Sequence, residues 1–375
     1  MRTNYQQIDA IDLFCGAGGL TKGLSNSKIN VRAGVDNDVN CKFPYTTNNN
    51  AKFLLKSVKD INACELAEYY KKGNLKLLAG CAPCQTFSTY NSKADTTDSR
   101  WWLLLEFARL VNELNPEFVT MENVPGLVKQ QVFDDFVNNL NTRGYFVNFG
   151  IVDCSEYGLP QQRKRLVLLA SKFKEIKLLS NKDFDAKQTT VYDAIGHLPP
   201  LKHNDCNDND ILHQTAKLSQ LNLKRIRASR PGGSWKDWAE ELVADCHKRK
   251  SGKTYAGVYG RMCWDKPAPT MTTQFYGFGN GRFGHPEQDR AISLREGAIF
   301  QGFPEDYKFI DKDNPVKKTV IGRLIGNAVP VTLGEVIGQS FMQHIKEYND
   351  EKKKKALTRK TGKNHQRISK RKKTI

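Results

Sequence analysis

The sequence predicts an α/β fold built on a doubly wound, mostly parallel sheet, together with a second, smaller, loop-rich domain. Short β-rich runs alternate with helical patterns through the first half of the 375 residues. The alternation fades from about residue 175 to 285, where turn residues and aromatics dominate. Strands that alternate with helices predict a parallel sheet covered on both faces, with ligands at the carboxyl ends of the strands.

The individual elements follow from local patterns. Segments 99–115 and 130–144 have helical periodicity, and Gly144 is a suitable stop for the second. Helical patterns return near 293–304 and 319–348. The predicted strands are six β-rich runs: 10–14, 29–36, 75–80, 117–123, 145–153 and 165–171.

The length of the chain favours two domains, because a single hydrophobic core rarely grows beyond about 250 to 300 residues. We expect an α/β domain over 1–184 and a loop-rich domain over 185–285. A hinge over 286–350 would return the chain to the first domain, and a disordered basic tail would cover 351–375.

Positive charge is concentrated in that tail. Lys and Arg total 58 against 40 Asp and Glu, a net charge of +18, and twelve of the basic residues but no acid fall in 352–375. The tail has too few apolar groups to fold alone. Three roles fit the tail: a solvated extension, a sequence-independent contact to phosphate backbone and a nuclear import signal. Composition does not separate them.

Other sequence features predict a soluble, intracellular protein that contacts no membrane. The sequence has no run of about 18 apolar residues and does not begin with a signal-peptide pattern. Nine cysteines are scattered from Cys15 to Cys263, unlike the dense disulfide framework of a small secreted domain. We expect reduced thiols and a cytoplasmic location, or a nuclear one if the source is eukaryotic.

A glycine-rich turn is the first candidate ligand site. "DLFCGAGGL" (12–20) is a strand followed by Gly16, Gly18 and Gly19, and a helix begins near Thr21. Such turns let backbone amides approach an anionic group, although the spacing is not that of a dinucleotide site. Asp36 lies twenty residues after Gly16, at a strand end, where a carboxylate can accept from a ribose diol. The pattern favours a nucleoside cofactor without a pyrophosphate, the alternatives being an ordinary turn and a helix cap.

The stretch "GCAPCQTFS" (80–88) places Cys81 and Cys84 at a spacing with three uses. Zinc needs four ligands, and the sequence has no second C-x-x-C, with His197 and His203 far away. A redox pair is disfavoured because thioredoxin-like motifs open a helix early in the domain. A nucleophilic thiolate needs an activating environment and an acid or base partner, for which Glu122 at the next strand end is the candidate. We expect no metal site.

Six motifs, in order, resemble those of the cytosine-C5 DNA methyltransferases, up to about residue 346. They are "DLFCGAGGL", "GCAPCQTFS", "MENVPGL" (121–127), "QQRKR" (161–165), "RAISLREGAIFQGFP" (290–304) and "IGNAVP" (325–330). The resemblance, closest to prokaryotic modification methyltransferases, implies a Rossmann-like methyltransferase fold. It makes 1–184 the catalytic, S-adenosylmethionine-binding domain and 185–285 the target-recognition domain.

The resemblance also implies roles for single residues. Cys84 would attack cytosine C6, and Glu122 would hold N3 and the amino group of the base. Arg163 and Arg165 would position the nucleophile loop, the base oxygen and phosphate, and Cys81 would be a packing residue. The expected S-adenosylmethionine contacts are Phe14, Gly16, Asp36, Asp60, Ile61, Leu103 and Asn327, with Asp60 ending a third strand. The expected DNA contacts are Gln85, Ser88, Gln161, Arg230 and Arg261.

The implied reaction is methyl transfer to C5 of cytosine in a specific short duplex sequence, by base flipping and a covalent cysteine–C6 intermediate. The implied partners are double-stranded DNA and a cognate restriction endonuclease that acts on the same sequence, with the protein itself a monomer. Two rival interpretations remain: a tRNA cytosine-C5 methyltransferase of the same fold, and a catalytically silent nucleic-acid-binding paralogue.

Overall fold

The computed structural model describes residues 6–83 and 102–371, and its centre is a seven-stranded sheet. The strand order is β3 (Lys52–Leu55), β2 (Asn30–Asp36), β1 (Ile8–Leu13), β4 (Leu75–Gly80), β5 (Phe118–Asn123), β7 (Lys164–Ser171) and β6 (Phe146–Asp153). The first five strands run parallel, and β7 runs antiparallel to both of its neighbours. The predicted doubly wound, mostly parallel sheet is confirmed.

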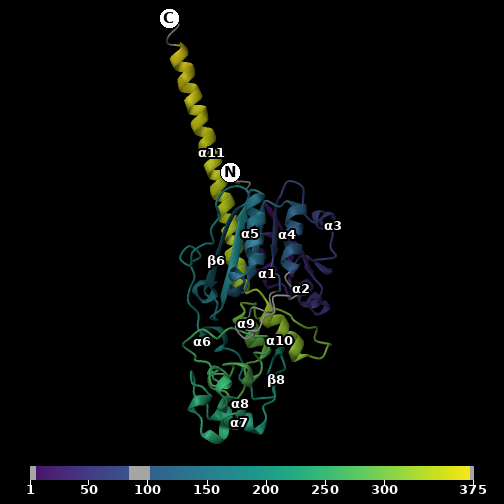
Figure 1. Cartoon of the computed structure of the whole chain (residues 1–375), viewed down its shortest axis with the longest axis vertical. Coiled ribbons are helices and arrows are strands. Elements are labelled where there is room, and N and C mark those ends of the chain that lie inside the picture. The colour runs from purple at the N-terminus through teal and green to yellow at the C-terminus, as the bar shows by residue number, and fades with distance from the viewer. Residues whose placement is uncertain (1–5, 84–101, 372–375) are drawn as a thin grey trace.

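Helices cover both faces of the sheet, as the alternating pattern requires (Figure 1). The helices α3 (Ala63–Ala67), α4 (Trp102–Leu114) and α5 (Gln131–Thr142) pack on one face, and α1 (Gly19–Asn26) and α11 (Val331–Arg371) pack on the other. The amphipathic pattern of α4 explains its place, because Leu104, Phe107, Val111 and Leu114 recur at helical spacing and are all buried. Successive residues of β1 alternate between the two apolar layers, so that Ala10 and Ile11 face opposite helices.

Helices α1 and α11, which are far apart in the sequence, cross and contact each other. A Cβ atom added to Gly23 of α1 would lie 2.3 Å from the carbonyl oxygen of Val331, so no larger residue fits this helix crossing. The Ser27 hydroxyl donates to the carbonyl oxygen of Glu335 at 2.9 Å. The last motif of the sequence is thereby held beside the glycine-rich turn of the first.

The sequence predicts a disordered tail over 351–375, but the backbone continues as helix α11 to Arg371, and 372–375 lie outside the described residues. It extends beyond the sheet in Figure 1. Lys, Arg, Ala, Leu and Gln are good helix formers, and a helix already anchored in the core avoids the cost of nucleation. Within the described residues, Lys318–Lys355 is the one helical stretch long and apolar enough to cross a membrane, but 72% of its apolar window is buried inside the protein. That stretch therefore belongs to the core.

The loop-rich part of the chain lies beyond one edge of the sheet (Figure 1). Trp235, Trp238 and Phe278 belong to a small apolar cluster within it. The regular elements of this part are α6 (Val191–Ile195), β8 (Cys206–Asn207), β9 (Asp210–Gln214), α7 (Gln220–Arg227) and α8 (Asp245–Lys248). Three helices lie between it and the sheet, and these are α2 (Lys42–Asn48), α9 (Leu294–Phe300) and α10 (Lys318–Asn327).

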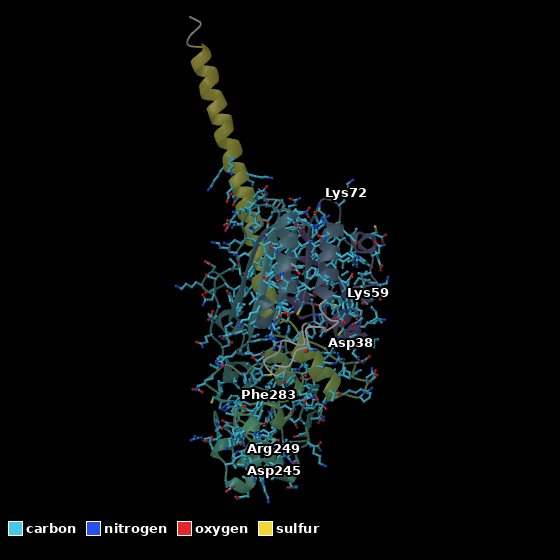
Figure 2. All side chains as sticks on the ribbon, viewed as in Figure 1. Asp38, Lys59, Lys72, Asp245, Arg249 and Phe283 are labelled. Atoms are coloured by element: carbon cyan, nitrogen blue, oxygen red, sulfur yellow. The ribbon has the colours of Figure 1, made fainter. Side chains whose placement is uncertain are left out.

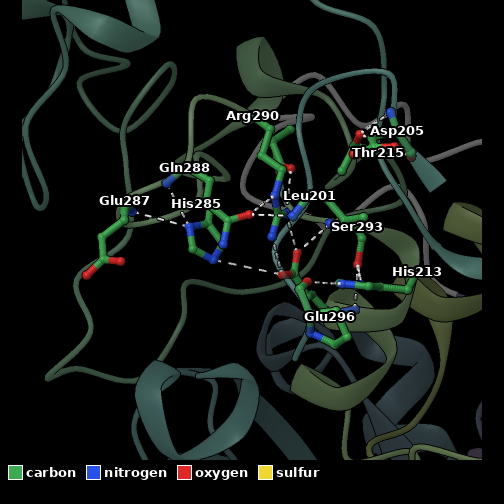
Figure 3. Close-up of polar contacts among 12 residues, drawn as sticks. Leu201, Asp205, His213, Thr215, His285, Glu287, Gln288, Arg290, Ser293 and Glu296 are labelled. Carbon is green, nitrogen blue, oxygen red and sulfur yellow. Dashed lines mark hydrogen bonds and ion pairs between the residues drawn. The ribbon is translucent and has the colours of Figure 1, made fainter. Parts of the chain in front are cut away.

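A buried ion pair organises the chain where the loop-rich part returns to α9. The guanidinium of Arg290 donates to both carboxylate oxygens of Glu296 at 2.7 Å, and each side chain is 1% exposed (Figure 3). Ser293 caps α9 by accepting from the Glu296 amide, and the His213 ring bonds to its hydroxyl at 2.9 Å. Burial lowers the pKa of His285, which lies beside this pair, to about 3.

Candidate active site

Several of the predicted site residues, among them Asp36, Glu122 and Arg165, lie at the edge of the sheet where the parallel strands end. Segments that follow β1, β2, β4 and β5 all reach this edge. Because β7 is antiparallel, it brings its first residues there, among them Arg165, rather than its last. The edge faces α9 and α10, whose apolar side chains pack against Cys15 and Ala17 of the glycine-rich turn.

The glycine-rich turn after β1 has the backbone geometry of a ligand loop. Phe14 has φ +58°, an unfavourable conformation for a residue with a side chain, and it is followed by Gly16 at φ +53° and Gly18 at φ +92°. Strain of this kind persists only where the surroundings fix it, and it clusters at functional sites. The amide of Gly16 donates to Asp36 Oδ2 at 2.9 Å, which ties the ends of β1 and β2 together.

Asp36 keeps acceptor capacity for a ligand. Its other oxygen, Oδ1, accepts from the Asp38 amide at 2.9 Å, and the Asn37 amide also donates to this carboxylate. A carboxylate has about four lone-pair sites, so Asp36 can still accept a further hydrogen bond. Burial raises the pKa of Asp36, although the amides of Asp38 and Gly16 oppose the shift. Asp38 in turn pairs with Arg323 of α10 at 2.6 Å, and Figure 2 labels it beside this edge.

Asp12, inside the same motif, is a buried acid to which the sequence analysis gave no role. Its Oδ2 accepts from the Thr21 hydroxyl at 2.7 Å, and Oδ1 has no hydrogen-bond partner among the described residues. Burial raises the pKa of Asp12 to about 7. The sequence could have indicated this buried acid, because Asp12 lies directly before the glycine turn and Thr21 lies near the start of the helix that follows.

Glu122 lies at the end of β5 with its side chain 3% exposed. Arg165 Nε is 2.8 Å from Glu122 Oε1, and the Cys81 thiol donates to Oε2 at 2.8 Å. The next residue, Asn123, donates from its side-chain amide to the carbonyl oxygen of Ala82 at 2.9 Å. An acidic group is therefore held between the strand that leads to Cys84 and the strand that begins with the basic motif.

Arg163 is a buried structural anchor rather than a group at the surface of the site. Its guanidinium donates to the carbonyl oxygens of Met271 and Gly326, at 3.0 and 3.1 Å. Burial, and then the charge of Arg165, lower the pKa of Arg163 to about 9. The arginine thus joins the basic motif to the segment that carries Asn327.

Two of the predicted DNA contacts, Gln161 and Arg261, are buried and form their hydrogen bonds within the protein. Gln161 is 0% exposed, donates to the Phe300 carbonyl oxygen at 2.8 Å and accepts from the Met271 amide at 2.7 Å. Arg261 is 5% exposed and donates to four backbone carbonyl oxygens and to Asp289. Arg230, by contrast, has a side chain that is 75% exposed and a single 3.3 Å contact to Asp237.

The remaining predictions fall in several environments. Asp60 is exposed and does not end a strand, because β3 stops at Leu55 and Asp60 lies in the following turn, bonded to Ser57. Ile61 is 2% exposed in the core, Leu103 is half-buried, and Asn327 is exposed at the end of α10. Cys84, Gln85 and Ser88 lie outside the described residues, which resume at residue 102. Over 6–83 and 102–371, no group of three His, Cys, Asp or Glu is placed to hold a metal.

Comparison with known proteins agrees with this geometry. The family model for C-5 cytosine-specific DNA methylases matches residues 8–344. The chain belongs to this family. It is 48% identical over 338 residues to the Type II methylase M.HgiDII of Herpetosiphon aurantiacus, covering 89% of this chain and 95% of that one. It is 31% identical to the Type II methyltransferase M1.BsuMI of Bacillus subtilis (strain 168), covering 88% and 80%.

Solved structures agree on the fold of this C-5 cytosine methylase. A prophage-encoded E. coli protein described as a DNA modification methyltransferase superposes with a TM-score of 0.68 at 23% identity, over 90% of this chain and 99% of the other. The methyltransferase EhMeth of Entamoeba histolytica gives 0.60 at 18% identity, over 91% and 98%. The protein is a DNA (cytosine-5)-methyltransferase of the kind found in restriction–modification, and DNA is its partner.

Proposed function

We propose that the protein transfers a methyl group from S-adenosylmethionine to C5 of cytosine in one short duplex DNA sequence, through base flipping and a covalent bond from Cys84 to C6. The observation that supports this most is the Glu122 carboxylate between Arg165 and Cys81, at the edge where the chain continues from Pro83 into Cys84. Cys84 follows the end of β4 by four residues, and the end of this strand lies beside a buried acid, which suits a nucleophile for covalent catalysis.

The glycine-rich turn fits the proposed cofactor. The strained Phe14–Gly16 backbone leaves room for a ligand, since a Cβ on Gly16 would meet nothing within 4 Å, and Asp36 retains lone pairs for a ribose diol. Phe14, Gly16 and Asp36 would hold the nucleoside part, with Leu103 and Asn327 as further proposed contacts. Asp60 and Ile61, in the turn after β3, are also proposed to contact the cofactor. S-adenosylmethionine supplies an electrophilic methyl group when bound.

The residues of the chain would carry the rest of the reaction. C5 of cytosine is a poor nucleophile, and addition of the Cys84 thiolate at C6 makes it an enamine-like carbon. Glu122 would bind N3 and the amino group while charge develops on the ring, and Arg165 would hold the opposite side of that carboxylate. Loss of the C5 proton and expulsion of the thiolate complete the cycle. A base inside the duplex cannot reach these groups, so it must be rotated out, at a cost of a few kcal/mol that DNA contacts offset.

Recognition of DNA belongs to the loop-rich part of the chain in this proposal. Arg230 is exposed there and can donate to a base edge or a phosphate, and Gln85 and Ser88 are proposed contacts from the nucleophile loop. The basic end of α11 is proposed to contact phosphates without reading sequence. We also propose a cytoplasmic monomer that protects DNA from an endonuclease of the same specificity.

The test is transfer of a labelled methyl group to duplex DNA and, in parallel, to tRNA, with Cys84→Ser as the matched variant. We expect label in duplex DNA only and none with Cys84→Ser. DNA in which the target cytosine carries fluorine at C5 should trap a denaturation-resistant complex, because fluorine cannot leave as the C5 proton does. Methylation of tRNA alone would reject the DNA substrate, and absence of transfer to both would favour a silent binding paralogue.

A further inference from the structure

The Cys81 thiol donates a hydrogen bond to Oε2 of Glu122, the carboxylate oxygen that does not contact Arg165. The register of β4 and β5 explains the contact, because Gly80 pairs with Met121 and the next residues on each strand therefore lie side by side. The Cys81 sulfur is 2.8 Å from Glu122 Oε2. Cys81 is partly exposed, so it is not merely filling the core.

A second bond fixes the segments that bring the thiol and the carboxylate together. The side chain of Asn123, next to Glu122, donates to the carbonyl oxygen of Ala82, next to Cys81, at 2.9 Å. The two strand ends are thus joined twice, by Cys81 to Glu122 and by Asn123 to Ala82. These two contacts place Cys81 beside Glu122 on the segment that leads into Cys84.

We propose that Cys81 is a positioning residue for Glu122. The thiol on Oε2 and the guanidinium of Arg165 on Oε1 hold the carboxylate plane in the orientation that receives the base. A thiol suits this task because it is a weak donor, which the stronger amino group of an entering cytosine can displace from the same oxygen. The proposal rests on the role of Glu122 in the proposed function. It adds to the predicted packing role of Cys81, which also packs against the apolar layer that contains Leu77 and Ala79.

The first test compares Cys81→Ala with Cys81→Ser in steady-state methylation of duplex DNA. Loss of a net hydrogen bond worth about 1 kcal/mol predicts that Cys81→Ala lowers kcat about 3- to 10-fold, with KM for DNA within about twofold of the parent. Cys81→Ser should recover most of kcat, because a hydroxyl donates to the same oxygen. Cys64→Ala removes an exposed thiol from α3 and should change neither constant.

The second test is a double-mutant cycle with Glu122→Gln. If Cys81 acts through the carboxylate, Cys81→Ala should have little further effect on the residual kcat of Glu122→Gln. A structural defect would instead lower kcat by the same factor in both backgrounds, which would overturn the proposal. Equal kcat losses for Cys81→Ala and Cys81→Ser would overturn it as well. Full activity of Glu122→Gln would reject the proposed function itself, a result distinct from either of these.

Discussion

Two buried carboxylates, Glu296 and Glu122, each face an arginine, yet the protein treats them differently. Both oxygens of Glu296 accept from Arg290 at 2.7 Å, and the Ser293 amide adds a third bond at 2.6 Å. Burial alone would raise the pKa of Glu296, but the charge and hydrogen bonds of Arg290 lower it to about 2. Arg290 and Ser293 thus use three of about four acceptor positions of Glu296, and this buried pair, which fixes the start of α9, is structural (Figure 3).

Glu122 is equally hidden but incompletely used. The 2.8 Å contact between its Oε1 and Arg165 Nε has the distance of an ion pair without the alignment of a hydrogen bond, and Oε2 has the weak thiol donor. A buried carboxylate with so few hydrogen bonds destabilises the folded state unless a ligand donates to it. The contrast indicates that the number of acceptor positions still open, more than burial or an arginine partner, separates a reactive acid from a structural one.

The sharpest test of this contrast is Glu122→Gln. We expect kcat to fall on the order of 10²- to 10⁴-fold, the usual effect of removing an acid–base group, with little change in the free energy of unfolding. Labelled methyl transfer and denaturant unfolding of the same preparation would measure both. A large loss of stability would mean that the Glu122 pair is structural like the Glu296 pair.

Glu296→Gln should show the opposite pattern. Breaking a buried ion pair leaves Arg290 uncompensated and should cost about 3 to 5 kcal/mol in the free energy of unfolding. The folded pKa of Glu296 lies below its ordinary value of 4.5, so the stabilisation is present above that pH and is lost as pH falls towards about 2. Parent and variant should therefore converge in acid, and a pH-independent difference would contradict the assignment.

A third buried acid, Asp12, sharpens the comparison because no positively charged side chain pairs with it among the described residues. Its raised pKa means that the folded state favours the protonated acid, so the stability of the parent should fall as pH rises from about 4 to about 7. The slope should reach at most about 1.4 kcal/mol per pH unit. Asp12→Asn cannot ionise and should give a flatter curve over that range, measured by unfolding at several pH values, whereas an unchanged slope would place the proton elsewhere.

The smallest expected effect applies the same contrast to guanidinium groups. Arg230 is exposed and has a 3.3 Å contact to Asp237, so Arg230→Gln should weaken DNA binding by about 1 kcal/mol. The slope of the logarithm of the binding constant against the logarithm of the salt concentration should fall by about one. The free energy of unfolding should stay unchanged. Arg261 is the control for Arg230, because its guanidinium donates to groups within the protein. Arg261→Gln should destabilise the fold, and equal effects of both changes on DNA binding alone would refute the distinction.

Local patterns predicted most of the sheet, because strands such as 75–80 and helices such as 102–114 carry their periodicity in the sequence. The four-residue β3 has exposed Lys52 and Leu55 at its ends, too short a pattern to detect. The antiparallel direction of β7 depends on pairing between distant segments, which local periodicity does not contain. The helical extension of α11 was missed because charge composition indicates disorder while the anchored first turns favour helix.

The sequence predicted which residues lie at the edge of the sheet better than it predicted their burial and hydrogen-bond partners. Asp36, Glu122 and Arg165 lie at the expected edge, since a strand end can be read from sequence. The burial of Gln161 and Arg261 was not predicted, because the sequence does not show whether a polar side chain donates to carbonyl groups of distant segments. The Cys81 contact was missed for the related reason that β4–β5 register decides it.

The crossing of α1 and α11 has a consequence for biosynthesis. Ser27 bonds to the carbonyl oxygen of Glu335, a contact that spans 308 residues, so the helix after the glycine-rich turn is completed by a segment that leaves the ribosome 308 residues later. Contacts between such distant segments form late, because the intervening chain must first be ordered. A nascent chain that stops before α11 would therefore lack the support of its cofactor turn, which would keep unfinished copies from modifying DNA.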